Sequence, residues 1–323
     1  PLFIGNLGMH GAYAANMAVS ECDLLFSIGT RFNDRITGKL HEFAPHAQIV
    51  HIDIDTAAIS RNIHVDVPIV ADAKDAITKM NEYVVPCKTK KWLDEIDEWQ
   101  HVHPLTMKKH AEMGPMDIIG EINRQFDEAI IVTDVGQHQM FAAQFTEITE
   151  KKQIIMSGGL GTMGYGFPGA IGAKLGNPDK PVIMISGDGG MQMNIQEFAT
   201  AVLEELPVIL CVFNNTYLGM VRQWQKLFYG KRYGMTDLRA GALTRRTNGE
   251  EKPEYTPDFI KLAESYGAKG IRVTKTDEIA AAFEEAKKNT KVPTLIEFII
   301  DPEEMVFPMI KPGGTLEEMI IEC

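Results

Sequence analysis

Two polar, glycine-rich segments of this 323-residue sequence have the residue types and the spacing of a magnesium site. Gly-Asp-Gly stands at 187–189 and Asn-Asn at 214–215, and each motif follows an apolar run. The chain between Asp188 and Asn215 accommodates a strand, a helix and a strand, which would bring both side chains to neighbouring strand ends. Mg²⁺ prefers oxygen ligands, and a carboxylate, an amide oxygen and the backbone carbonyl of Tyr217 would leave positions for phosphate oxygens and water. The sequence therefore predicts a magnesium–diphosphate site.

Two other interpretations remain open from the residues alone. Gly187, Gly189 and Gly190 would let the backbone approach a diphosphate, but turns at Asp188 and at Asn-Asn explain either motif taken singly. The stretch 159–164 also fits G-x-G-x-x-G between a predicted strand and a predicted helix, with an acidic residue after the next strand. That pattern favours a nicotinamide or flavin dinucleotide site, although it leaves the Asn-Asn pair unexplained.

Apolar runs separated by helical stretches predict an α/β fold. In a first block, residues 23–28 and 48–54 are predicted to be buried strands. A second block contains five such runs, at residues 129–133, 153–156, 181–185, 207–213 and 293–299. Strands alternating with helices indicate two doubly wound parallel-sheet domains, in which ligands bind at the carboxyl ends of the strands. The expected division is a first domain at 1–85, a linker with a connecting helix at 86–113 and a second domain at 114–323.

Composition excludes several classes of protein. The net charge of -12 argues against nucleic-acid binding, which needs clustered Lys and Arg. No apolar run reaches the ~20 residues of a membrane-spanning helix. Four widely spaced cysteines form no Cys-x-x-Cys pair, which favours a reducing compartment such as the cytoplasm.

Taken together, the motifs resemble one enzyme family. Gly-Asp-Gly with Asn-Asn is similar to the signature of thiamine-diphosphate enzymes, and further segments narrow the resemblance to the C-terminal portion of acetolactate synthase (acetohydroxyacid synthase) catalytic large subunits. These segments are Gly136-Gln-His-Gln-Met140, Ser157-Gly-Gly-Leu-Gly-Thr-Met-Gly-Tyr-Gly166, Gly219-Met-Val-Arg-Gln-Trp-Gln225, Leu7-Gly-Met-His-Gly11 and Arg31-Phe-Asn-Asp-Arg35. The resemblance covers nearly the whole chain.

The resemblance implies a thiamine diphosphate site in the second block. Asp188, Asn215 and the Tyr217 carbonyl would hold Mg²⁺, while Gln137 and His138 would contact the diphosphate. Further residues would shape the cofactor and its pocket. Met163 would bend the cofactor, Gly161 would offer a carbonyl to its amino group, and Trp224 would select the second 2-keto acid. The others are Gly187, Gly189, Gly190, Met193 and Met220.

The first block would be a truncated FAD-binding domain, with FAD in a structural role. Residues 10–31 and 53–72 match the family's two FAD-contacting stretches, with His10, Arg31, Asp53 and Asp72 as the candidate contacts. One residue departs from the family pattern, because Asn33 stands where a second acid is usual. This change removes a charge near Arg35.

Two further departures concern whole segments. Residues 234–257 are longer and more basic than the family pattern leads us to expect, and they are either a mobile cap over the site or a solvated insertion. No residue matches the glutamate that activates thiamine diphosphate, which the family carries in an N-terminal pyrimidine-binding domain. We therefore expect the sequence to be a fragment of a longer subunit and inactive in isolation.

The implied enzyme is a transferase of EC class 2.2.1.6. It would decarboxylate pyruvate and join the two-carbon unit to pyruvate or 2-ketobutyrate in branched-chain amino-acid biosynthesis. The resemblance implies a homodimer or higher oligomer, and it is compatible with a regulatory small subunit. Another thiamine-diphosphate carboligase, decarboxylase or oxidase would share Asp188 and Asn215 and differ in its acceptor pocket.

Overall fold

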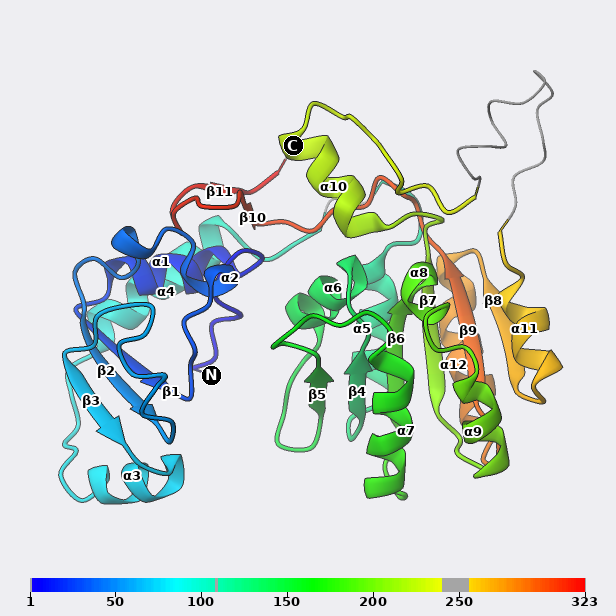
Figure 1. Ribbon diagram of the computed structural model, residues 1–323, viewed down its shortest axis with the longest axis horizontal. Coiled ribbons are helices and arrows are strands. Elements are labelled where there is room, and N and C mark those ends of the chain that lie inside the picture. The colour runs from blue at the N-terminus through cyan, green and yellow to red at the C-terminus, as the bar shows by residue number, and fades with distance from the viewer. Residues whose placement is uncertain (1, 108–109, 240–255, 323) are drawn as a thin grey trace. The chain divides into compact units, whose positions relative to one another are not determined.

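The structure, a computed structural model, describes residues 2–107, 110–239 and 256–322 and contains two compact units. The first unit is formed by Pro1–Thr106 together with Phe307–Cys323, and the second unit by Met107–Val306 (Figure 1). In the described residues no helix is both long enough and apolar enough to cross a membrane.

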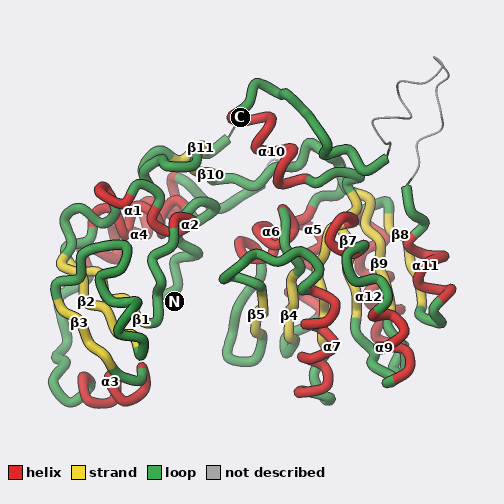
Figure 2. Tube along the Cα trace, in the orientation of Figure 1, coloured by secondary structure: helices red, strands yellow, loops and turns green. Residues whose placement is uncertain are grey.

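The second unit is built on a six-stranded parallel sheet with the order β5-β4-β6-β7-β9-β8. Its strands (yellow) alternate along the chain with helices (red) in Figure 2. The strands are β4 (Ile130–Thr133), β5 (Gln153–Met156), β6 (Val182–Gly187), β7 (Ile209–Asn214), β8 (Lys269–Val273) and β9 (Thr294–Ile299). The helices are α5 (Pro115–Gln125), α6 (Gln137–Phe145), α7 (Gly166–Gly176), α8 (Asp188–Met191), α9 (Glu197–Leu203), α10 (Gly219–Phe228), α11 (Phe259–Ser265) and α12 (Ile279–Lys288), with a 3₁₀ turn η2 (Thr276–Glu278).

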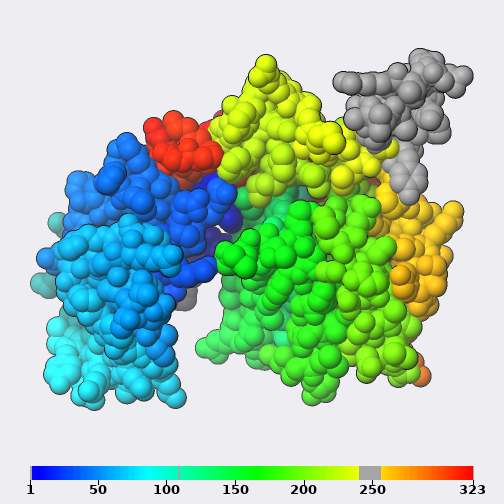
Figure 3. Space-filling view, in the orientation of Figure 1, coloured from blue at the N-terminus to red at the C-terminus, as the bar shows by residue number. Residues whose placement is uncertain are grey.

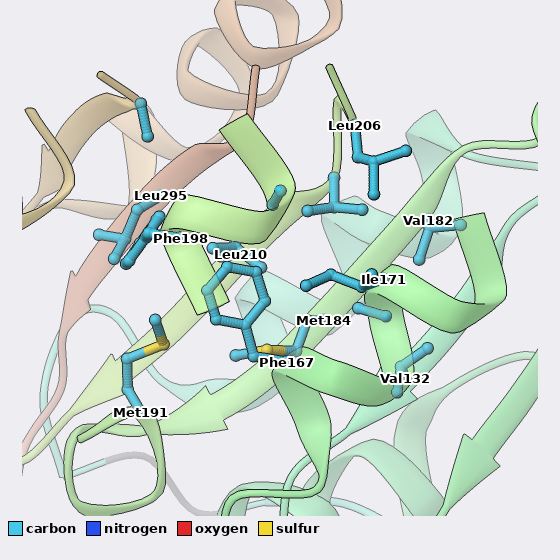
Figure 4. Packing of buried hydrophobic residues seen from close by; sticks show 14 of the residues in the cluster. Val132, Phe167, Ile171, Val182, Met184, Met191, Phe198, Leu206, Leu210 and Leu295 are labelled. Atoms are coloured by element: carbon cyan, nitrogen blue, oxygen red, sulfur yellow. The ribbon is translucent and has the colours of Figure 1, made fainter. Parts of the chain in front are cut away.

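Helices cover both faces of this sheet, which confirms the predicted doubly wound arrangement. Alternate residues of the central strands, such as Met184 and Leu210, pack against Phe167 of α7 and Phe198 of α9 (Figure 4). On the opposite face Phe298 of β9 lies against Phe283 of α12, with ring centroids 5.8 Å apart. Because both faces are buried, the central strands are nearly continuous apolar runs.

The chain reverses its direction of strand addition next to β4. It runs from β4 outward to β5, then returns to place β6 on the other side of β4. The connections that leave β4 and β6 therefore diverge, and a crevice forms at the carboxyl ends of these strands. In Figure 1 those ends point upward, toward α6, α8 and α10.

The first unit contains a three-stranded parallel sheet with the order β1-β2-β3. Its strands are β1 (Leu24–Ile28), β2 (Gln48–Asp53) and β3 (Val67–Val70), and its helices are α1 (Tyr13–Glu21), α2 (Asp34–Thr37), α3 (Ala73–Met80) and α4 (Lys90–Val102), with a 3₁₀ turn η1 (Leu40–Glu42). The expectation that residues 23–28 form a buried strand is wrong, because β1 is an edge strand and Leu24, Phe26 and Ile28 are exposed in the described structure. β3 was not expected.

The compact units differ from the expected domains at two places. Part of the expected linker, helix α4, packs on α1 inside the first unit, where the rings of Tyr13 and His103 lie tilted against each other with centroids 4.0 Å apart. The C-terminal residues expected in the second domain belong to the first unit as well. There β10 (Met309–Ile310) and β11 (Met319–Ile320) pair antiparallel, and the N–H of Ile310 donates to the carbonyl of Met9 at 2.9 Å. Apolar burial explains this placement, since Ile310 and Leu316 lie in the apolar core of that unit.

Candidate cofactor and metal site

A cavity lies at the carboxyl ends of β4, β6 and β7. It is lined by the loops that follow these strands, by Met163 of the glycine-rich loop and by the first turn of α10. Its volume of about 90 Å³ is several times the ~10–15 Å³ that one water molecule needs, so it is more than a packing defect. Residues around 215–235 (yellow-green) form the upper part of this unit in the space-filling view (Figure 3). The cavity is therefore at the ligand-binding edge expected for this fold.

Asp188 opens α8 on the cavity wall and is almost fully buried. Burial raises the pKa of Asp188 to about 7, although hydrogen bonds from backbone N–H groups, that of Gly189 foremost, act in the opposite direction. The negative charge of Glu297 contributes to the rise. A divalent cation would favour the ionised carboxylate, since a nearby opposite charge offsets the cost of desolvation.

The two asparagines of the Asn-Asn pair have different surroundings. Asn215 lines the cavity, and its side-chain oxygen accepts the N–H of Tyr217 at 3.0 Å. Asn214, which ends β7, instead donates its side-chain N–H to Glu297 at 2.7 Å. Successive residues of an extended chain point to opposite sides, so only Asn215 is left for a ligand. Tyr217 also lines the cavity.

Any metal here would be held partly by neutral oxygens. In the described ranges no three His, Cys, Asp or Glu side chains gather in a way that could hold a metal ion. The predicted metal ligands at the cavity are one carboxylate, one amide oxygen and one backbone carbonyl, those of Asp188, Asn215 and Tyr217. This set suits Mg²⁺, which commonly takes one or two protein carboxylates together with phosphate oxygens and water.

His138 presents an unpartnered nitrogen within this buried region. Burial lowers the pKa of the imidazole to about 4, and the charge of Asp134 only partly opposes the shift, so the ring is neutral near pH 7. Its Nε2 atom is buried and has no hydrogen-bond partner in the described structure. Because the backbone of Asp134 is the partner of the other ring nitrogen, donation from Nε2 to a phosphate oxygen in the cavity would require the protonated ring, which the negative charge of the phosphate would favour.

Gln137 joins the cavity wall to two other segments. Its side-chain N–H groups donate to Gln223 and to the carbonyl of Glu304, each at 2.8 Å. Gly219 approaches so closely that a Cβ there would lie 2.3 Å from the side-chain oxygen of Gln137. Glycine at 219 thus permits the contact between the first residue of α10 and the first residue of α6.

Asp134 holds the glycine-rich loop and is a site residue that no sequence motif identified. Its carboxylate is 1% exposed and accepts the N–H of Gly164 at 3.0 Å and that of Gly166 at 3.1 Å. The N–H of Val135 donates to the same carboxylate at 2.5 Å. The only signal in the sequence is the position of Asp134, directly after an apolar run.

This arrangement weighs against the dinucleotide interpretation. In such a site backbone N–H groups of the glycine-rich turn face a pyrophosphate, whereas here the N–H groups of Gly164 and Gly166 face Asp134. From this loop only Met163 is on the cavity wall.

Most of the predicted thiamine-site residues meet at this cavity, and three do not. The predicted residues on its wall are Gln137, His138, Met163, Gly187, Asp188, Gly189, Gly190, Asn215, Tyr217 and Met220. Gly161, Met193 and Trp224 are not among the lining residues. Met193 is 53% exposed, and Trp224 packs edge-on against Phe228.

Three of the four predicted FAD contacts lie at the carboxyl edge of the first unit's sheet. Arg31 follows β1, Asp53 ends β2 and Asp72 follows β3. The carboxylate of Asp72 also caps α3 by accepting two backbone N–H groups. The fourth, His10, precedes α1, and burial lowers its pKa to about 4. Asn33 caps α2 by accepting the N–H of Arg35 at 3.0 Å. The asparagine that stands where the family pattern has an acid therefore still caps this helix.

Comparison with protein families identifies the class to which this fold and cavity belong. Residues 134–298, just over half of the chain, match the C-terminal TPP binding domain of thiamine pyrophosphate enzymes, and residues 1–80 match the central domain of the same enzymes. The chain belongs to the thiamine pyrophosphate enzyme family.

Individual relatives narrow the similarity further. The chain is 43% identical over 331 residues to a probable acetolactate synthase large subunit of Methanocaldococcus jannaschii, with 99% of this chain and 53% of the relative covered. It is 42% identical over 328 residues to the acetolactate synthase large subunit of Cyanidium caldarium, with 99% and 53% covered. With the isozyme 3 large subunit of Escherichia coli the identity is 38% over 327 residues, with 98% and 54% covered. The chain thus spans about half the length of these relatives.

Proposed function

We propose that this chain is the flavin-binding and pyrophosphate-binding portion of an acetolactate synthase large subunit. The complete protein would decarboxylate pyruvate and add the two-carbon unit to a second 2-keto acid, pyruvate or 2-ketobutyrate. The observation that carries the proposal is the cavity where a buried carboxylate, an amide oxygen and an unpartnered imidazole nitrogen converge. The similarity to acetolactate synthase large subunits supports it.

Asp188, Asn215 and the carbonyl of Tyr217 would hold Mg²⁺. Their oxygens account for three of the six positions of an octahedral ion, and the diphosphate and water would fill the others. The metal would also favour ionised Asp188 in a place where burial alone favours the protonated acid.

Gln137 and His138 would position the diphosphate, and Met163 and Met220 would shape the apolar wall around the rest of the cofactor. When bound, thiamine diphosphate supplies the thiazolium that stabilises the carbanion left by decarboxylation. The chain would contribute orientation of the cofactor and exclusion of water from the reacting centre. The assigned roles of Gly161, Met193 and Trp224 remain predictions, because these residues lie off the cavity wall.

The first unit would bind FAD at the carboxyl edge of its parallel sheet. Arg31, Asp53 and Asp72 share that edge, where parallel sheets bind ligands. Asp53 and Asp72 would accept hydrogen bonds from ribose and adenine groups.

The relatives are about twice as long as this chain. We therefore propose that acetolactate synthesis requires protein outside these 323 residues, including the carboxylate that activates the cofactor. A homodimer, or a higher oligomer with a regulatory small subunit, would be the working enzyme.

The test is acetolactate formation by the product of the complete reading frame that contains these residues. Pyruvate, thiamine diphosphate, Mg²⁺ and FAD should yield acetolactate, and the variant Asp188→Ala should yield none. Asp179→Ala, which removes an exposed carboxylate from the same unit, should keep full activity. Bound thiamine diphosphate without acetolactate would instead indicate another carboligase, decarboxylase or oxidase of the family.

A further inference from the structure

Thr216 lies between two of the proposed metal ligands in an uncommon backbone conformation. Its φ is +61°, in the left-handed region. A β-branched residue is strained there because its side chain crowds the backbone, and such a conformation persists only when the surroundings hold it. Its N–H donates to the side-chain oxygen of Asn214 at 3.0 Å. That contact restrains one side of the residue.

A later segment restrains the other side. Residues 236–238 run antiparallel to residues 216–218, with Tyr217 opposite Asp237. The N–H of Leu238 donates to the carbonyl of Thr216 at 2.9 Å, and the N–H of Leu218 donates to the carbonyl of Thr236 at 2.8 Å.

This pairing determines which way the Tyr217 backbone faces. The two bonds flank Tyr217 and Asp237, so these residues form a non-hydrogen-bonded pair, whose own N–H and C=O groups point away from the opposite segment. On that far side the N–H of Tyr217 meets the side-chain oxygen of Asn215 at 3.0 Å. The carbonyl of Tyr217 is thereby directed to the same side as the Asn215 oxygen.

Arg239 fastens the segment to the Tyr217 side chain. Its guanidinium donates to both carboxylate oxygens of Asp237, at 3.0 and 3.1 Å. It also donates to the hydroxyl of Tyr217 at 2.5 Å and lies 5.0 Å from the centre of that ring. The guanidinium of Arg222 lies 4.9 Å from the same ring centre. A charge-assisted, two-point pairing of this kind fixes direction as well as position.

We propose that residues 236–239 form a strap that holds Thr216 in the left-handed conformation and so positions Asn215 and Tyr217 for a divalent metal. Asp237 and Arg239 are positioning residues, since neither is among the residues that line the cavity. The inference rests on the proposed function, because the metal in question is the Mg²⁺ of that site.

The test measures the Mg²⁺ concentration that half-saturates thiamine diphosphate binding, using the product of the complete reading frame. Arg239→Ala should raise this concentration about tenfold, the size of effect expected when a partner that orients a metal ligand is removed. Thr216→Gly alone should leave it near the wild-type value, because glycine adopts positive φ without strain. The double variant should recover most of the lost affinity, since it no longer needs the strap to maintain the turn.

Arg232→Ala is the matched control, because it removes an exposed arginine from the same region of the chain. It should leave the half-saturating concentration unchanged. An unchanged value in Arg239→Ala would overturn the inference, and so would a double variant as impaired as Arg239→Ala. Because the readout is binding, failure of the strap is distinguishable from failure of the proposed reaction, which acetolactate formation tests separately.

Discussion

Replacing Asp134 by Asn should loosen the glycine-rich loop while changing the shape of the side chain very little. The carboxylate of Asp134 is buried and accepts N–H groups from Val135, Gly164 and Gly166. An asparagine offers one acceptor oxygen instead of two, and its NH₂ group would face one of these backbone donors. At least one buried N–H group would then lack an acceptor.

The expected loss follows from the number of contacts. A hydrogen bond to a charged group contributes about 1.5–3 kcal/mol, and an unsatisfied buried donor costs about 1–3 kcal/mol. Since asparagine keeps part of the acceptor capacity, we expect Asp134→Asn to lower the free energy of unfolding by about 2–4 kcal/mol. This is a large share of the ~5–15 kcal/mol that stabilises a typical domain.

Two assays measure this effect. Urea unfolding followed by circular dichroism gives the change in free energy, and amide hydrogen exchange gives the protection of Gly164 and Gly166, which should fall. Asp127→Asn is the control, because it makes the same charge change at an exposed position just before β4. If Asp134→Asn shifted the unfolding midpoint no more than the control, or left the exchange of both glycines unchanged, the reasoning would be refuted.

Three further predictions test the core and two ionisable groups. Phe198→Ala should lower the free energy of unfolding by about 3–5 kcal/mol, because Phe198 is fully buried against Phe167. Leu203→Ala, on the same helix but 80% exposed, should change the free energy of unfolding little when both variants are measured by urea unfolding. Equal losses in the two variants would contradict the burial of Phe198 in the core. Two basic side chains of α10 hold the pKa of Glu303 at about 2, so its stabilising contribution is present above its ordinary pKa of 4.5 and is lost as pH falls toward 2. Glu303→Gln should therefore lower the melting temperature at pH 6 but not near pH 2, and a deficit that persists at low pH would count against the ion pairs. Because burial raises the pKa of Asp188 to about 7, its ionisation destabilises the metal-free fold progressively as pH rises from about 4 to above 7. Asp188→Asn should thus raise the metal-free melting temperature at pH 8 more than at pH 4, and equal shifts at both would argue against a perturbed carboxyl.

The central strands of the second unit are predictable from the sequence because they are buried on both faces. Their residues form continuous apolar runs, as in 207–213. The edge strand β8 contains Lys269 and Arg272, and the edge strand β3 contains Pro68, so neither has such a run. Edge strands meet solvent and tolerate these residues.

The metal-site residues are predictable because parallel strand ends meet at one edge. Asp188, Asn215 and Tyr217 all lie on the cavity wall, as their positions after β6 and β7 indicate. The supports around them are different, since they depend on contacts between segments far apart in sequence. Asp134 acts on a loop about 30 residues later, with partners identified only by the fold.

Local conformation and long-range packing explain the remaining differences between the structure and what the sequence predicts. No pattern marks Thr216 as left-handed, because the pairing with residues 236–238 imposes that conformation. The C-terminal residues carry apolar side chains at 310 and 316, but their sequence does not specify which unit they will cover. The segment 234–257, expected to be either a mobile cap or a solvated insertion, falls mostly on residues 240–255, outside the described residues.

The most direct test of the central claim is calorimetric titration of thiamine diphosphate into the product of the complete reading frame, with Mg²⁺ and then with EDTA. The account predicts saturable binding that requires the metal, is lost in Asp188→Ala and persists in Asp179→Ala. Binding of equal strength in EDTA, or undiminished binding by Asp188→Ala, would contradict the assignment of this cavity as a magnesium–diphosphate site.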